Sequence, residues 1–209
     1  MKTWVTVACL ALAIGGCATP SYDFSEYNKA PPRSILVVPV VNRSLDVDAS
    51  NYVLSTLTVP LAELGYYVFP VNTVKIVLEQ EGFYEPELVR KMGTPELANL
   101  FGADAVLYVT INRWDAQYIL ISTTVTVEFD YELQRKDGAR IWHANKQMRY
   151  SPQQQNQGAN PLVALIAAAV EAAVVRAAPN YLPLTQQANT QVFVVEHTKL
   201  PNGPYAVKK

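Results

Sequence analysis

Three acidic side chains at alternate positions, Glu128, Asp130 and Glu132, have a type and a spacing that could do chemistry. They lie in a stretch of alternating polar and apolar residues, which predicts a β-strand with all three carboxylates on one face, about 7 Å apart. Carboxylates at that spacing could hold a hard cation or act as an acid–base pair. The pattern is equally typical of a solvated sheet face with alternating charges, and we interpret the three residues in that way, with the site as the alternative.

Other catalytic or metal-binding patterns are missing from the sequence. The two histidines, His143 and His197, are far apart, and neither stands in a ligand spacing typical of zinc sites. We interpret His143 as a solvated strand residue. The sequence contains no nucleophile elbow, no Ser-x-x-Lys pair and no phosphate-binding glycine loop. It therefore predicts a protein that is not an enzyme and that has no cofactor and no metal site.

Cys17 is the residue with the most specific modification chemistry, because it closes a segment with the parts of a secretion signal. Lys2 gives a short positive start, residues 4–14 form an apolar run, and Gly15 and Gly16 precede the cysteine. This order resembles the bacterial lipobox, and the resemblance implies a signal peptide over residues 1–16, cleavage before Cys17 and acylation of that cysteine. Two acyl chains anchor a protein stably in a bilayer where one does not.

Three alternatives are open for this segment. The apolar run is shorter than the roughly 20 residues that a transmembrane anchor needs. Cleavage after Ala18 would release a soluble periplasmic protein, and retention in the cytoplasm would leave the apolar start without a function. Because position 18 is not Asp, the sorting rule for such lipoproteins implies the outer membrane, with the folded part on the periplasmic side.

Composition indicates a folded body behind this anchor. Half of the residues are hydrophobic, and 17 basic side chains nearly balance 18 acidic ones without forming a basic block, so we expect no nucleic acid partner. Cys9 leaves with the signal and Cys17 carries the lipid, so the folded part has no disulfide to form. We expect residues 17–33 to be the lipidated cysteine and a flexible tether that reaches up to about 50 Å. Residues 34–197 should be a single domain, and residues 198–209 a loose tail.

The first half of the domain has the alternating strands and helices of an α/β fold. The pattern predicts strands over 34–41 and 66–69, and helices over 48–64, 74–80, 87–92 and 94–101. Pro39 must lie at a strand end, or beside a bulge or an edge. Gly65 is placed to end one helix, Asn72 or Thr73 to cap the next, and Thr94 to cap the last.

The second half changes to period two, which predicts an antiparallel meander on the same sheet. Strands are expected over 104–114, 124–134 and 140–150, with Asp137 and Gly138 as a two-residue hairpin turn between the last two. Apolar residues from Val125 to Leu133 alternate with the carboxylates. One sheet face should therefore be dry and cover the helices, while the wet face places the carboxylates near Arg149.

A long apolar helix is predicted over residues 162–178 and completes a mixed sheet with a β-α-β-α-α start, an antiparallel meander and this helix packed on one face. Its second side is smooth, which suits the core or an interface between subunits, and consists of Ala164, Ala168, Ala172 and Val175. A membrane span is the third alternative, although Glu171 would then lie inside the bilayer at a cost of about 2.5–3.5 kcal/mol. Residues 181–189 fit no single structure, and residues 192–196 are expected to form a short strand.

Three phrases of the sequence carry a family resemblance: residues 35–42 (ILVVPVVN), 64–68 (LGYYV) and 100–111 (LFGADAVLYVTI). They resemble the α/β domain shared by the curli-secretion lipoprotein CsgG and the N-terminal domain of TolB, and most of all a family of bacterial lipoproteins of unknown function. Val40 stands where that group has an aromatic residue, so the match is partial. The resemblance covers about residues 34–178 and implies a lipid-anchored scaffold, but it carries over no active-site residue.

These observations predict a non-enzymatic outer-membrane lipoprotein that associates with itself and docks with other envelope proteins in transport or secretion. A periplasmic ligand-binding protein or enzyme is the first alternative, with its site on the carboxylate face or beside residues 42–44 at the mouth of the sheet. The second alternative is an oligomeric pore with strands from residues 119–133 and 140–150, which are long enough to span a bilayer.

Overall fold

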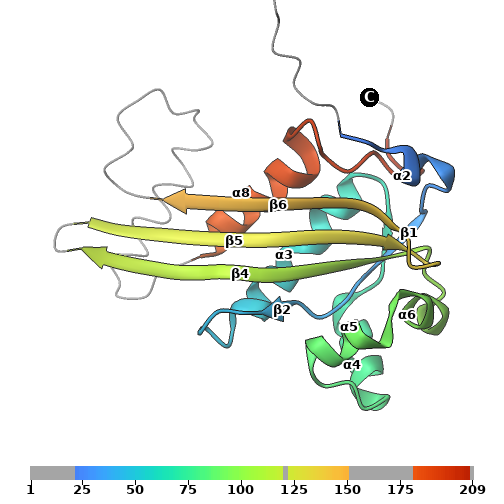
Figure 1. The fold of residues 1–209 in the computed structure, drawn as a ribbon, viewed down its shortest axis with the longest axis horizontal. Helices are drawn as coiled ribbons and strands as arrows, with labels where there is room; N and C mark the ends of the chain where they lie inside the picture. The colour runs from blue at the N-terminus through green and yellow to red at the C-terminus, as the bar shows by residue number, and fades with distance from the viewer. Residues whose placement is uncertain (1–21, 120–121, 151–180, 208–209) are drawn as a thin grey trace, which may run out of the picture.

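A mixed six-stranded sheet organises the computed structural model, which describes residues 22–119, 122–150 and 181–207 (Figure 1). The strands are β1 (Ser34–Val37), β2 (Val41–Asn42), β3 (Tyr67–Val68), β4 (Ala105–Ile119), β5 (Ser122–Arg135) and β6 (Arg140–Tyr150). Their order is β3-β1-β4-β5-β6, and β2 also pairs with β4. The pairs among β1, β2, β3 and β4 are parallel, and β4, β5 and β6 form the antiparallel meander. The predicted mixed α/β sheet is confirmed.

Pro39 divides the first predicted strand in two. β1 ends at Val37 and β2 begins at Val41, and both pair in parallel with β4. A proline has no N–H to donate to the ladder, so the placement of Pro39 at a strand end is confirmed and the continuous strand over 34–41 is wrong. On β4, Asn112 is the extra residue of a bulge between Ile111 and Arg113, which lies just beyond β2.

Four helices lie between β2 and β4, all at predicted positions: α3 (Ala49–Glu63), α4 (Val71–Gln80), α5 (Pro86–Met92) and α6 (Thr94–Phe101). Two of their starts differ from the prediction. The cap of α4 is Pro70, so neither Asn72 nor Thr73 begins it. The cap of α6 is Gly93. The hydroxyl of Thr94 bonds to the side chains of Tyr108 and Gln134 in the sheet instead.

Helices cover the whole of one sheet face and part of the other. On the first face, α3, α8 (Leu182–Thr190) and the π-helix η2 (Gln191–Val195) pack over the predicted dry side of β5, whose apolar residues from Val125 to Leu133 are fully buried. On the second face, α4, α5 and α6 cover β1 and the first residues of β4 up to Tyr108. Figure 1 shows β4 to β6 in front of α3 and α8, with α4 to α6 below β4. The predicted wet face is therefore open only beyond that layer.

The C-terminal part differs most from the prediction. Residues 192–196 form no strand, because η2 continues α8 and buries Val192 and Phe193. The ring of Phe193 lies 5.5 Å from that of Tyr131 and 5.8 Å from that of Trp142. The helix predicted over 162–178, including Ala164, Ala168, Ala172 and Val175, lies outside the described residues. Among the helices that the structure describes, none has the length and apolar character needed to cross a bilayer.

The hairpin between β5 and β6 is one residue longer than predicted. The N–H of Arg135 donates to the carbonyl of Ala139 at 2.8 Å, which leaves a three-residue loop. Gly138 has a φ of +86° at the end of this loop, and the strand register shifts farther along, between Leu133 and Gln134, where Ile141 is the extra residue of β6. A three-residue hairpin with a left-handed last residue and a bulge is the common alternative to a two-residue turn. The extra residue brings Ile141 as well as Trp142 into the core.

Most of the expected tether and tail is folded onto the domain. Residues 25–29 form helix α2 (Ser25–Lys29), and its Tyr27 is only 3% exposed. The hydroxyls of Tyr27 and Tyr66 are 2.6 Å apart, and Tyr66 donates to the carbonyl of Pro201. Leu200 is fully buried. The expectation of a flexible tether is therefore wrong from residue 22 onward, and that of a loose tail is wrong up to residue 207, because both segments supply apolar side chains to the core.

Gly65 ends α3 as predicted and also receives the C-terminal tail. Its φ is +88°, and a Cβ here would lie 2.0 Å from the backbone nitrogen of Ala206. The substitution Gly65→Ala should lower the free energy of unfolding by about 2 kcal/mol, because strain and a backbone clash add together. The amide of Gly203, which donates to Leu64, should then exchange faster with solvent. Urea denaturation and hydrogen exchange measure the two effects.

Gly82→Ala is the matched control for this prediction. Gly82 has a φ of +86°, but no atom lies within 4 Å of the Cβ that would be added. The control should therefore show only the backbone strain, about 1 kcal/mol. Equal losses in the two variants would contradict the packing of the tail against Gly65.

Candidate functional site

A polar pocket of about 370 Å³ opens on the second sheet face, at the point where the layer of α4 to α6 ends. β4 supplies Tyr108 and Thr110, β5 supplies Asp130 and Glu132, and β6 supplies His143. The remaining lining comes from α5, from the residues around β2 and from other positions of β5 and β6: Val41, Arg43, Glu87, Arg90, Tyr131, Arg140 and Ala144. The pocket therefore lies on the predicted carboxylate face and also beside residues 42–44, the two places that the sequence offered for a ligand site.

Arg90 of α5 fixes one wall of this pocket. Its guanidinium lies over the ring of Tyr108, 5.0 Å from the centroid, and forms an ion pair of 2.8 Å with Glu132. A second nitrogen donates to the hydroxyl of Thr110 at 3.4 Å. The planar guanidinium thus forms an ion pair with a carboxylate and a cation–π contact with an aromatic face at the same time. Glu132 also accepts from Gln134 at 2.8 Å, so its charge is fully engaged.

Tyr108 and Thr94 connect this wall to the buried base of α6. The hydroxyl of Thr94 lies 2.9 Å from that of Tyr108 and also donates to Gln134. Burial raises the pKa of Tyr108, and Arg90 offsets part of that rise. The phenol therefore remains neutral at physiological pH. This chain of contacts positions α5 over β4, and it is a structural support of the pocket rather than a reactive group.

The three predicted carboxylates do not act together. Asp130 and Glu132 line the pocket, whereas Glu128 lies outside it and contacts Gln147. Asp130 accepts from the amides of Asn112, the bulge residue of β4, and Asn145. No contact with Arg149 is found for them among the described residues. Within the same residues, no three acidic, histidine or cysteine side chains come close enough to hold a metal ion.

Cationic side chains are the pocket residues that the sequence did not reveal. Arg90 lies in helix α5, whereas the predicted carboxylates lie on strand β5, and Arg140 is the first residue of β6. His143 is exposed, as predicted, and its Nδ1 lies 3.2 Å from the hydroxyl of Tyr22. No sequence signal could have selected these residues, since only the chain topology brings α5, β2 and β6 to one place. Cys17 lies outside the described residues.

A second candidate surface is the loop of residues 43–48 between β2 and α3, which we name the Leu45 loop. Leu45 is 101% exposed and Val47 is 84% exposed. Burying such a side chain would stabilise the protein by about 1.5–3 kcal/mol, yet both point into solvent. The sequence analysis found no function for these two residues, because a single apolar residue in a loop has no periodic signal.

Polar side chains hold the Leu45 loop in this conformation. The Oδ1 of Asn42 accepts from the backbone and the hydroxyl of Ser44, at 2.9 and 2.7 Å, and its amide donates to the carbonyl of Asp46 at 2.7 Å. Asp46 in turn accepts from the backbone of Asp48 and from the indole of Trp114, both at 3.0 Å. The loop therefore presents its two apolar side chains from a braced backbone.

Comparison with known proteins gives consistent matches. The family model described as "Putative lipoprotein GNA1162-like" matches residues 22–205. The Neisseria meningitidis serogroup B (strain ATCC BAA-335 / MC58) protein named "Putative lipoprotein NMB1124/NMB1162" is 32% identical over 174 residues, which cover 81% of this chain and 80% of that protein.

Solved structures agree with this match. The crystal structure of lipoprotein GNA1162 from Neisseria meningitidis has a TM-score of 0.58 and 31% identity, and the match covers 69% of this chain and 99% of that one. A PelC dodecamer from Paraburkholderia phytofirmans reaches a TM-score of only 0.40 with 17% identity, over 63% of this chain and 77% of that one. A likeness that low carries no conclusion about function. From the family model and the Neisseria relative, the chain belongs to the GNA1162-like family of lipoproteins.

Proposed function

We propose that this protein is a lipid-anchored docking protein of the cell envelope, not an enzyme, and that it binds a protein partner through the Leu45 loop. The observation that carries the proposal is the exposure of Leu45 and Val47 on a loop braced by Asn42 and Asp46. An apolar anchor that is already ordered loses little conformational entropy when it enters a partner's pocket. The outer membrane and self-association, both expected from the sequence, are parts of the same proposal.

The position of the folded N-terminal segment supports the proposal that the Leu45 loop binds a protein and not the lipid bilayer. If Cys17 carries the lipid, five Cα steps separate it from Tyr22, and these reach at most about 18 Å. Tyr22 is held on β6, where it accepts from the backbone N–H of His143 at 2.8 Å. The domain is thus held close to the membrane by its β6 side, whereas a 16-residue tether would have let it move away.

The Leu45 loop lies on the other side of the sheet from this attachment. It follows β2, and β4 and β5 separate β2 from β6. Figure 1 shows the start of the described chain at the upper edge of the domain and the loop beyond β2 at the lower left. A domain anchored through Cys17 would therefore point Leu45 and Val47 away from its own membrane, toward a protein in the periplasm.

Photo-crosslinking in living cells tests the proposal. A photoreactive amino acid at position 45 of the full chain should form a discrete adduct with a protein, which mass spectrometry identifies after purification under denaturing conditions. The substitution Val47→Ser should reduce the yield of this adduct several-fold without changing the melting temperature, since Val47 is mostly exposed.

Position 207 is the matched control. Val207 is 86% exposed but lies in the C-terminal segment, so a crosslinker there should give no equivalent adduct. An adduct between two copies of the chain would identify the partner as the protein itself. Adducts with lipid alone, or none at position 45, would contradict the proposal.

A further inference from the structure

The pocket on the second sheet face combines charges of both signs, and its ligand need not be the partner of the Leu45 loop. Three arginines and three carboxylates line it: Arg43, Arg90, Arg140, Glu87, Asp130 and Glu132. Their formal charges cancel. Such a pocket has no net charge that would favour binding of a simple anion or a simple cation, unless some of its charged groups are already engaged with neighbours.

The charged groups on the floor of the pocket already have partners. Glu132 is paired with Arg90 at 2.8 Å. Asp130 accepts two amide donors, from Asn112 and Asn145. Arg43 donates to the neutral amide oxygen of Asn112 at 3.3 Å. These groups bind one another, and a ligand would have to break existing contacts to reach them.

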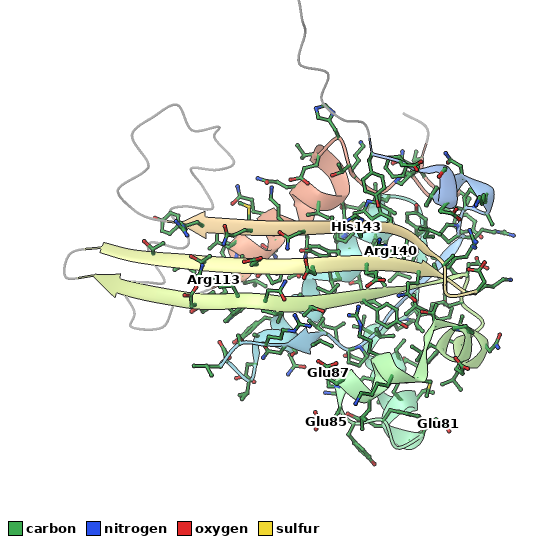
Figure 2. The ribbon with its side chains drawn as sticks, viewed as in Figure 1. Glu81, Glu85, Glu87, Arg113, Arg140 and His143 are labelled. Carbon is green, nitrogen blue, oxygen red and sulfur yellow. The ribbon has the colours of Figure 1, made fainter. Side chains whose placement is uncertain are left out.

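The charged groups on the two rims lack such partners. Within the described residues, neither the side chain of Arg140 nor that of Glu87 forms a hydrogen bond or an ion pair. The neighbouring His143 uses Nδ1 toward Tyr22 and leaves Nε2 for another partner. Figure 2 shows Arg140 and His143 together on β6, and Glu87 across the sheet on the helical side. The open donors and the open carboxylate therefore face the same pocket from opposite sides.

The distance between the rims sets the length of a ligand. α5 lies over β4, because Arg90 contacts Thr110, and β6 is two strands from β4 in the sheet. Neighbouring strands are separated by about 4.8 Å, so the backbones of β4 and β6 are about 10 Å apart, and the height of α5 above β4 adds to the distance between the rims. The volume of about 370 Å³ is at the lower end of the range for small-molecule sites, which starts at about 300 Å³.

We propose that this pocket binds a small zwitterion, with its oxyanion at Arg140 and His143 and its ammonium group at Glu87. A peptide of two or three residues with free ends has these charges, since an extended chain spans about 3.3 Å per residue. The site is separate from the Leu45 loop, so it is tested independently of the docking function.

Titration of the protein that begins after Cys17 with trialanine tests this inference by calorimetry. Trialanine should bind in the micromolar to millimolar range, and N-acetyl-trialanine and trialanine amide should each bind at least about tenfold more weakly, because each lacks one charge. Arg140→Gln should abolish the preference for the free carboxylate, and Glu87→Gln the preference for the free amine. Arg149→Gln is the matched control, since Arg149 lies on the same strand outside the pocket and should leave binding unchanged.

Each outcome decides the inference. Binding that follows the two charges and the two rim residues supports it. Binding that ignores the end groups, or that Arg149→Gln weakens as much as Arg140→Gln, overturns it. The absence of binding heat with trialanine also overturns it, provided that the circular dichroism spectrum shows that the protein is folded. The crosslink from position 45 would remain in that case, so failure here would be distinct from failure of the docking proposal.

Discussion

Replacing Cys17 with serine should move the protein from the membrane fraction to the soluble periplasmic fraction. The lipobox-like segment predicts a diacylglyceryl group on this sulfur, and each buried methylene contributes about 0.8 kcal/mol to membrane binding. Cell fractionation and incorporation of labelled palmitate measure the change, which should be almost complete.

Cys9→Ser is the control for this experiment. Cys9 lies within the apolar run of the signal, so its replacement should leave both palmitate labelling and membrane association intact. The competing cleavage after Ala18 makes a different prediction: the native protein would then be unlabelled and soluble, and Cys17→Ser would change nothing. Mass spectrometry of the native N-terminus separates the two results.

Replacing Asn189 with alanine should destabilise the domain by about 3 kcal/mol, because the buried hydroxyl of Tyr131 would lose its acceptor and that of Thr56 would lose its amide donor. Tyr131 donates to Oδ1 of Asn189 at 2.7 Å, and the amide of Asn189 lies 2.8 Å from the hydroxyl of Thr56. Tyr131 and Asn189 are 1% exposed. Burial also raises the pKa of Tyr131 well above its ordinary value. This network joins α8 to both β5 and α3, and its loss should be measurable by urea denaturation.

A double substitution tests the mechanism of this loss. When Tyr131→Phe and Asn189→Leu are combined, fewer polar groups remain buried without a partner, so the combined cost should be smaller than the sum of the two single costs. Asn99→Ala, at an exposed position of α6, should change stability by less than about 0.5 kcal/mol. Additive costs would show that the three side chains do not form one network.

Local patterns were sufficient for the elements that are long or have a clear end. Helix α3 and its stop at Gly65, the buried alternation of β5 and the conflict between Pro39 and a continuous strand all agree with the sequence. In each case the determining force acts within a few residues: helical or strand periodicity, a left-handed glycine, or a missing N–H donor.

Short segments were predicted wrongly, because distant residues decide their structure. The segment at 192–196 has the composition of a strand, but Tyr131 and Trp142 offer an aromatic surface that it covers as a π-helix. Residues 22–33 and 198–207 are polar and rich in proline or glycine, yet a few apolar side chains such as Tyr27 and Leu200 fix them to the core. The composition of a segment cannot show that another part of the chain forms a surface on which that segment packs.

The sequence by itself determined the lipidation prediction at Cys17, the α/β class and the membership of the family, because these depend on order and spacing along the chain. Only the tertiary structure decided where the charges of Arg90, Arg140 and Glu87 meet and which loop carries exposed apolar residues. It also decided that the chain folds from residue 22 onward. The physical reason is that charge pairing and burial depend on distance in space. The strands β4 to β6 and the helices on the two sheet faces bring together residues that are far apart in the sequence.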